Sequence, residues 1–343
     1  MTTPRPEPAR HRTGKRLNTM TLRRRHLNAT ALVAFGCLAA QAVLAQADEL
    51  TPNDWLNKMA RAVQTTNYEG TVVRIKDDSV EVMKVVHVVA DGVVREKIVT
   101  QEGNGLEIIR NGNEIHCILP DKKSVLVDEW NEQNSLFSTL PSSDVRFGGQ
   151  YDVLFDGKAR VAGRKAVILA IKPHDEYRFG YRIWLDTQTG FPLKTILIGD
   201  DGDAIEKVKF ADIVLDEEIH ASALQPTNST DGFRWITEPH RKATRAVESE
   251  WNSEGLPPGF TVLSTHAEEL PGSDALVTHI RLSDGLVDVS VFVQPSASEQ
   301  PVERSTVGAS NSYSYTIAGH VVTAVGDVPA ATVELIARSM QAE

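Results

Sequence analysis

Between residues 68 and 127 the sequence alternates short runs rich in β-branched residues with very short polar connections. The connections carry the residues of hairpin turns, namely Asp91-Gly92, Gly103-Asn104-Gly105, Asn111-Gly112-Asn113 and Pro120-Asp121. A parallel strand pair needs a crossover of about a dozen residues or more, so these connections can join only antiparallel neighbours. The region is therefore predicted to be an antiparallel meander, with strands at 68–76, 80–89, 93–100, 106–110, 114–119 and 124–127.

A helix is predicted before this meander and more strands after it. Thr51-Pro52-Asn53-Asp54 has the residues of a helix start. One apolar stripe follows and ends near residue 64, made of Trp55, Met59, Ala62 and Val63. Residues 129–150 are predicted to be a loop or short helices, and strands resume at 151–155, 165–171, 178–186, 191–199 and 204–215. Roughly eleven strands and one helix predict a mainly β fold with α+β character, in which a large curved antiparallel sheet or half-open β-barrel holds helices in its concave face.

The composition changes after residue 215, which predicts two domains. Residues 48–215 form the first, residues 216–232 a linker rich in acidic and small polar residues, and residues 233–343 the second. The second domain is predicted to be a small α+β unit with strands at 260–267, 275–282, 286–293, 312–317 and 320–325. A closing helix from Pro329 carries an apolar stripe of Val333, Ile336, Ala337 and Met340.

The first 47 residues have the pattern of an export signal. Arg23-Arg24-Arg25 precedes an apolar run at 29–44, and Ala45-Gln46-Ala47 offers a cleavage site. Cleavage after Ala47 is predicted, and either Met1 or Met20 could be the start. A membrane anchor is the alternative, but the apolar run is shorter than the ~20 residues a spanning helix needs. The mature chain is therefore expected to be a soluble, exported protein.

Charge and cysteine content limit the classes of function. The whole chain has a net charge of −10, and residues 1–47 contain eight basic residues and one acid, which leaves a net charge of −17 on the rest. A chain this acidic would be repelled by phosphate, which argues against a nucleic-acid partner. Only Cys117 would remain after cleavage, so the mature chain can form no internal disulfide, and we expect Cys117 to be a small buried hydrophobic residue.

The sequence contains no recognisable catalytic or metal-binding pattern. The histidines are scattered without ligand spacing, and no nucleophile elbow or phosphate-binding glycine motif is present. Asp200, Asp201 and Asp203 could hold calcium weakly, but they lack the spacing of an EF-hand loop. No catalytic residue, metal or cofactor is therefore predicted, and the chain is expected to bind rather than catalyse.

Aromatic residues are the candidates for such binding. The candidates for a lipid cavity are Phe137, Phe155, Phe179, Tyr181, Trp184 and Phe191, and those for partner binding in the second domain are Phe260, Phe292, Tyr313 and Tyr315. The alternative is that these aromatic residues are ordinary core, and strand alternation does not decide which face forms a pocket.

Four stretches of the chain form a distinctive set. The first domain contains Asn67-Tyr68-Glu69-Gly70-Thr71 and Ile109-Arg110-Asn111-Gly112-Asn113-Glu114. The second contains Leu256-Pro257-Pro258-Gly259-Phe260 and the run from Gly319 to Pro329. This set resembles the MucB/RseB proteins, periplasmic regulators of an envelope-stress sigma factor, whose implied location for this chain is the periplasm. The resemblance covers residues 50–340 in the expected order. It does not extend to the residues before Met20 or to the charged hairpin tip Lys76-Asp77-Asp78.

The resemblance implies a fold, partners and a mechanism. The first domain would be similar to the LolA/LolB lipoprotein carriers, with a hydrophobic cavity. The second would help to hold the periplasmic segment of a membrane-spanning anti-sigma factor and shield it from a site-1 protease. Acylated signals, either lipopolysaccharide or lipoprotein, would release it.

Two other functions remain open at this stage. A periplasmic lipid carrier without a signalling partner is the main alternative, and a secreted hydrolase is the third. The sequence also leaves open whether the chain forms a homo-oligomer.

Overall fold

The computed structural model describes residues 50–76, 79–130, 137, 140, 149–237, 245–246, 251–269 and 276–342. The predicted export signal and most of the predicted loop at 129–150 lie outside the described residues. Within the described part of the chain, no helix has both the length and the apolar character needed to cross a membrane.

Helix α1 (Pro52–Thr65) begins where the sequence predicts. The Thr51 hydroxyl accepts a hydrogen bond from the Asp54 backbone N–H at 3.2 Å, and the Asp54 carboxylate accepts one from the Thr51 N–H at 2.9 Å. This reciprocal capping box satisfies two donors that a helix start otherwise leaves free.

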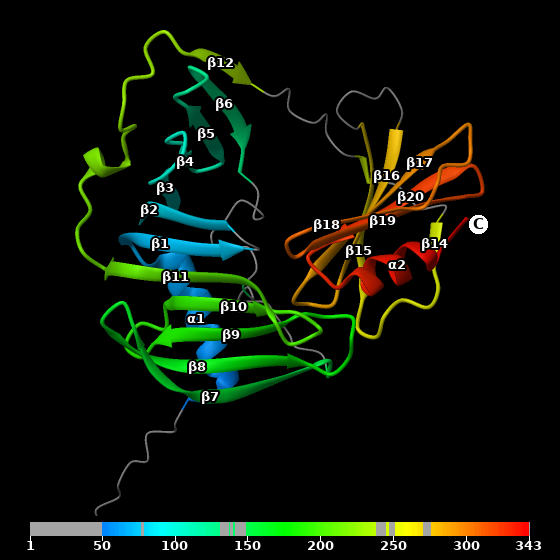
Figure 1. The fold of residues 1–343 in the computed structure, drawn as a ribbon, viewed down its shortest axis with the longest axis horizontal. Coiled ribbons are helices and arrows are strands. Elements are labelled where there is room, and N and C mark those ends of the chain that lie inside the picture. Colours follow the sequence, from blue (N-terminus) through cyan, green and yellow to red (C-terminus); the bar gives the residue numbers. More distant parts are fainter. Residues whose placement is uncertain are drawn as a thin grey trace, which may run out of the picture. The chain divides into compact units, whose positions relative to one another are not determined.

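The larger sheet has twelve strands and is not closed into a barrel (Figure 1). Its strands are β1 (Tyr68–Lys76), β2 (Ser79–Ala90), β3 (Val93–Thr100), β4 (Glu107–Asn111), β5 (Glu114–Leu119), β6 (Ser124–Glu129), β7 (Tyr151–Val161), β8 (Arg164–Pro173), β9 (Gly180–Asp186), β10 (Pro192–Ile198), β11 (Ala204–Leu215) and β12 (Arg234–Thr237). The order across the sheet is β12-β6-β5-β4-β3-β2-β1-β11-β10-β9-β8-β7, which leaves β12 and β7 as edges. All eleven strands predicted for this domain are present, and antiparallel pairing of β1 with β11 joins the two meanders.

The twelfth strand, β12, belongs to the first sheet, although it lies beyond the predicted end of the first domain. β12 lies within the range assigned to the second domain, yet it pairs in parallel with β6 of the first sheet. The long connection between β11 and β12 makes this parallel pairing possible. That connection includes the 3₁₀ helix η2 (Ala221–Leu224). Two hydrogen bonds fix it to the sheet. Lys97 donates to the Gln225 carbonyl at 2.6 Å, and the Thr227 N–H donates to the buried Glu107 carboxylate at 2.8 Å.

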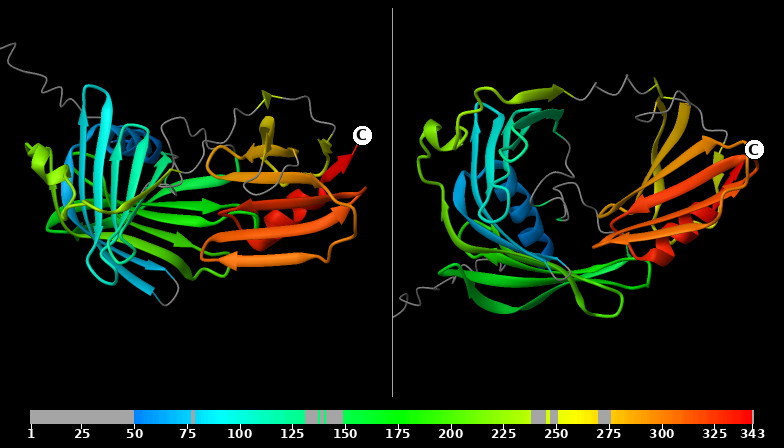
Figure 2. Two further views of the ribbon diagram at one scale, coloured as in Figure 1. Left: turned by 90° about the horizontal axis from the view of Figure 1, so that it is seen from above. Right: turned by 45° about the horizontal axis from the view of Figure 1, so that its top comes forward.

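One face of this sheet packs against α1, and we call it the helix face. Leu56 and Met59 of α1 contact a cluster that includes Leu169, Ile183 and Leu185. The strands bend around α1, as the right-hand view of Figure 2 shows. Side chains that alternate with these residues along each strand lie on the opposite face, which we call the outer face.

The second sheet has seven strands and carries one helix. Its strands, in spatial order, are β13 (Arg245–Ala246), β15 (Thr261–Glu269), β16 (Leu276–Ser283), β17 (Asp288–Pro295), β20 (His320–Gly326), β19 (Ser310–Ile317) and β18 (Glu303–Val307). Helix α2 (Ala330–Arg338) buries Val333 and Ile336 in a core with Leu282, Val289 and Val291. β14 (Trp251–Ser253) and β21 (Met340–Ala342) form a separate pair. The predicted α+β character of this region is confirmed.

Candidate functional site

Four aromatic rings meet on the helix face of the large sheet. The ring centroid of Phe191 lies 4.8 Å from Tyr68, 5.6 Å from Phe137 and 5.9 Å from Phe210. Tyr68, Phe191 and Phe210 are buried, and Phe137 is half-buried. These four residues form what we call the aromatic cluster, a tilted and edge-on arrangement that aromatic pairs favour.

Sequence reasoning selected two members of this cluster, Phe137 and Phe191. It missed Tyr68 and Phe210, which come from β1 and β11. The missing information was the pairing of β1 with β11, because these strands are far apart in the chain. The alternation of Val208, Phe210 and Lys209 in β11 could have indicated that Phe210 faces inward.

Asp186 fixes the turn that places Phe191. Its Oδ1 accepts hydrogen bonds from the N–H groups of Gln188 and Thr189 at 3.0 and 2.9 Å, and Oδ2 accepts one from Arg164 Nε at 2.8 Å. Burial by itself would raise the pKa of Asp186, but the hydrogen bonds from Arg164 and Thr189 outweigh it and hold the pKa below its ordinary value. An ionised Asp186 therefore orders the connection from β9 to β10.

A polar group lies beside the aromatic cluster on the same face. His87 Nδ1 is 2.8 Å from Glu96 Oε2, and the His87 ring stacks on Tyr68 with centroids 4.9 Å apart. Burial, followed by the nearby Glu96 charge, raises the pKa of Tyr68 well above its ordinary value, so its hydroxyl stays protonated. His87 Nε2 is buried and has no hydrogen-bond partner in the part of the chain that the structure describes.

The polar row continues across the sheet. Glu96 of β3 lies directly opposite Arg110 of β4, whose guanidinium sits 3.6 Å from the centroid of the Trp130 ring. Burial lowers the pKa of Arg110, and the Glu96 charge partly offsets that effect. The helix face is therefore apolar at the aromatic cluster and polar along one row next to it.

The other predicted lipid-cavity residues are spread over both faces and one edge. Phe179 and Tyr181 are buried in the cluster that contains Leu56 and Met59. Trp184 alternates with Ile183 and Leu185 along β9 and so projects from the outer face, where it is nevertheless buried, and it belongs to the same hydrophobic cluster as Phe191. Phe155 is 51% exposed on the edge strand β7. Their role in lipid binding stays a prediction.

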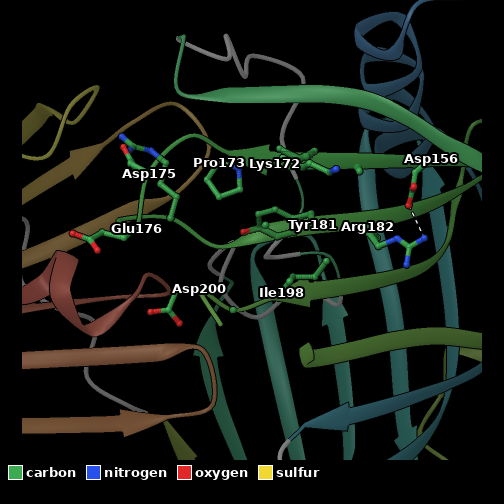
Figure 3. A pocket seen from close by; sticks show the side chains of 14 residues that line it. Asp156, Lys172, Pro173, Asp175, Glu176, Tyr181, Arg182, Ile198 and Asp200 are labelled. Carbon is green, nitrogen blue, oxygen red and sulfur yellow. Dashed lines mark hydrogen bonds and ion pairs between the residues drawn. The ribbon is translucent and has the colours of Figure 1, made fainter. Parts of the chain in front are cut away.

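A cleft of about 650 Å³ opens at the ends of β8, β9 and β10 (Figure 3). Arg182 and Asp156 form an ion pair of 2.5 Å in its wall. Arg178 also lines it, fully buried, with carboxylates of Asp175 and Asp284 at 2.5 and 2.6 Å. Charged side chains of both signs make this cleft suited to a polar ligand and unsuited to an acyl chain.

The described residues contain no group of three or more His, Cys, Asp or Glu side chains placed to hold a metal ion. Cys117 is half-buried on β5, and burial raises the pKa of its thiol above the ordinary value. A protonated thiol is a poor nucleophile, so this cysteine has the character of a packing residue.

Comparison with known proteins assigns both domains. The sequence model of the MucB/RseB N-terminal domain matches residues 51–228, and that of the MucB/RseB C-terminal domain matches residues 245–341. The chain belongs to the MucB/RseB family.

The curated relatives that the chain resembles are named as sigma-factor regulatory proteins. The chain is 30% identical to the sigma factor AlgU regulatory protein MucB of Pseudomonas aeruginosa over 91% of this chain and 96% of that protein. It is 26% identical to the sigma-E factor regulatory protein RseB of Escherichia coli over 83% of this chain and 89% of that protein. A crystal structure of MucB in complex with MucA(peri) is similar with a TM-score of 0.66 and 29% identity, covering 85% of this chain and 99% of that chain.

The MucB/RseB C-terminal domain holds the residues predicted to bind a partner. Phe260 and Tyr313 are buried in its core. Phe292 stacks on His279 with ring centroids 4.4 Å apart, and Tyr315 packs at the margin of the core. Contact of these four residues with a partner stays a prediction.

Proposed function

We propose that this protein is a periplasmic negative regulator of an envelope-stress sigma factor. It binds the periplasmic segment of a membrane anti-sigma factor and shields that segment from site-1 proteolysis. The observation that carries the proposal is the match of both MucB/RseB domains, in order, across residues 51–341. The likeness to MucB in its complex with MucA(peri), at a TM-score of 0.66, supports the same partner class.

We propose further that an acylated lipid releases the regulator. The aromatic cluster on the helix face is the binding site of the acyl chain. It is the largest group of contacting rings among the described residues, and it adjoins a polar row. Burial of an acyl chain contributes roughly 0.8 kcal/mol per methylene. Release requires only that the lipid binds the free regulator better than the complex.

Calorimetric titration of the mature chain, residues 48–343, tests the partner. The titrant is the periplasmic segment of the anti-sigma factor from the same genome, with and without lipopolysaccharide. We expect saturable binding that lipopolysaccharide abolishes. Lipid binding without any binding of the anti-sigma segment would contradict the proposal and favour a lipid carrier.

A pair of matched variants tests the proposed lipid-binding site. Phe137→Ala removes a half-buried ring from the aromatic cluster, whereas Trp235→Ala removes an exposed ring from β12. We expect Phe137→Ala to weaken the effect of lipopolysaccharide and Trp235→Ala to leave it unchanged, with thermal melts confirming that both fold. Equal effects of the two variants would contradict the assignment of the lipid-binding site to the aromatic cluster.

A further inference from the structure

The outer face of the large sheet carries a group of cations in register on neighbouring strands. Lys194 of β10 lies opposite Lys209 of β11, and Lys207 of β11 lies two residues from Lys209 on the same face. Arg182 of β9 lies opposite Ile196, the partner of Lys207. We call Arg182, Lys194, Lys207 and Lys209 the basic outer patch.

These positive charges are poorly compensated. Arg182 pairs with Asp156, but Lys194, Lys207 and Lys209 form no ion pair with any described residue. The nearest acid in register on this face is Asp212, beyond the bulge that interrupts the pairing of β1 with β11. Burial, and then the charges of Lys207, Lys209 and Arg182, lowers the pKa of Lys194. Like charges are therefore held together at a cost that a bound anion would relieve.

Apolar side chains lie among the cations. Lys194 Nζ is 4.1 Å from the centroid of the Trp184 ring. The rows continue onto β1 and β2, because Lys209 lies opposite Val73 and Lys207 opposite Ile75, which in turn faces the exposed Val80. The basic outer patch on β9, β10 and β11 thus adjoins a surface of aliphatic side chains on β1 and β2.

We propose that the basic outer patch docks the protein on a bilayer surface that contains anionic phospholipid headgroups. Anionic bilayers attract clusters of lysine and arginine near their surface. The strands that carry the patch are all interior to the sheet, so an added peptide strand has no free edge there. The four cations span β9 to β11, which is two strand spacings or about 10 Å, and they are spread over a surface, as the headgroups of a bilayer are, and not along the single line that an extended peptide would follow.

The acidic character of the rest of the chain does not prevent this docking. Surface charges interact over about 8 Å at physiological ionic strength. Asp203, in the hairpin before β11, is four residues or about 13 Å from Lys207 along the chain, and Asp200 and Asp201 are farther along it. Glu217 and Glu218 follow β11 at its other end, so the repulsion of these acids with a bilayer under the patch is largely screened.

Vesicle co-sedimentation of the mature chain, residues 48–343, tests this inference. The vesicles are phosphatidylcholine alone, or phosphatidylcholine with about a third phosphatidylglycerol, at physiological and at raised salt. We expect binding only to the anionic vesicles, weakened by salt. Lys207→Glu combined with Lys209→Glu, both exposed positions, should reduce the partitioning by about tenfold or more.

The control combines Lys122→Glu with Arg234→Glu, which changes the net charge equally on exposed residues near the opposite edge of the sheet. We expect this control to bind like the wild type. Equal binding to both vesicle types, or equal losses in the two double variants, would overturn the inference. Binding of soluble polyglutamate through Lys207 and Lys209 without vesicle binding would also overturn it and assign the patch to an acidic protein.

Discussion

The Asp186 carboxylate holds one ring of the aromatic cluster in place through the turn between β9 and β10. Its three partners, Arg164, Gln188 and Thr189, fix the turn that delivers Phe191 to the helix face. Gly190 completes the turn with a φ of 81°, a conformation that a side chain would strain. The Asp186 charge, at the end of β9, thus fixes the position of the Phe191 ring, which lies in the turn just before β10.

We predict that Asp186→Asn lowers the stability of the chain at neutral pH and that the difference from the wild type shrinks in acid. The folded pKa of Asp186 lies below its unfolded value, so its contribution is present above the unfolded pKa of about 3.9 and is lost as the pH falls through the folded pKa. Thermal melts at a series of pH values measure this. A difference that stays constant from neutral pH into acid would contradict the prediction.

At the scale of elements, Gly70 lets β1 approach β11 closely. A Cβ at this position would lie 2.4 Å from the Asp212 carbonyl oxygen and 3.1 Å from the Ile213 Cα. The bulge between Thr71 and Val72 follows at once in the same strand pair. This pairing joins the two meanders, so β1 has little freedom to move away.

We therefore predict that Gly70→Ala destabilises the chain by about 1–3 kcal/mol, the range seen when extra atoms are forced into a packed site. Chemical denaturation of the mature chain measures the change in the free energy of unfolding. Gly149→Ala is the matched control, because a Cβ there meets no atom within 4 Å. Similar losses for the two variants would show that the clash is not the cause.

The elements also show what sequence reasoning can and cannot predict. Strands bounded by Asp-Gly and Asn-Gly turns were predictable because their signals are local, as for β2 and β3. β18 was missed because all five of its residues are exposed and give no alternation. β12 was missed because its partner β6 is distant in sequence and parallel. Two of the four residues of the aromatic cluster, Tyr68 and Phe210, were missed because of a long-range pairing too. They become neighbours only when β1 pairs with β11.

At the scale of the whole molecule, a strongly acidic chain carries a local group of positive charges on one face of its large sheet. The chain after residue 47 has a net charge of −17, while the basic outer patch gathers cations on one face. The excess of acid favours a partner segment that carries positive charge. Electrostatic attraction of this kind acts mainly on the rate of encounter.

We predict that the association rate constant for the anti-sigma segment falls as salt rises from about 0.05 M to about 0.5 M, because screening shortens the range of attraction. Stopped-flow fluorescence at several ionic strengths measures it. A rate constant independent of salt would contradict an electrostatic contribution to this encounter.

The edge strand β7 has a consequence for the solubility of an unclosed sheet. Its pairing with β8 is interrupted by a bulge between Phe155 and Gly157, and Gly157 has a φ of 116°. Asp156, Lys158 and Arg160 add charges along the strand. A bulged, charged edge is a poor template for strands of other molecules. The sheet can therefore stay open along its length without recruiting further copies into a growing polymer.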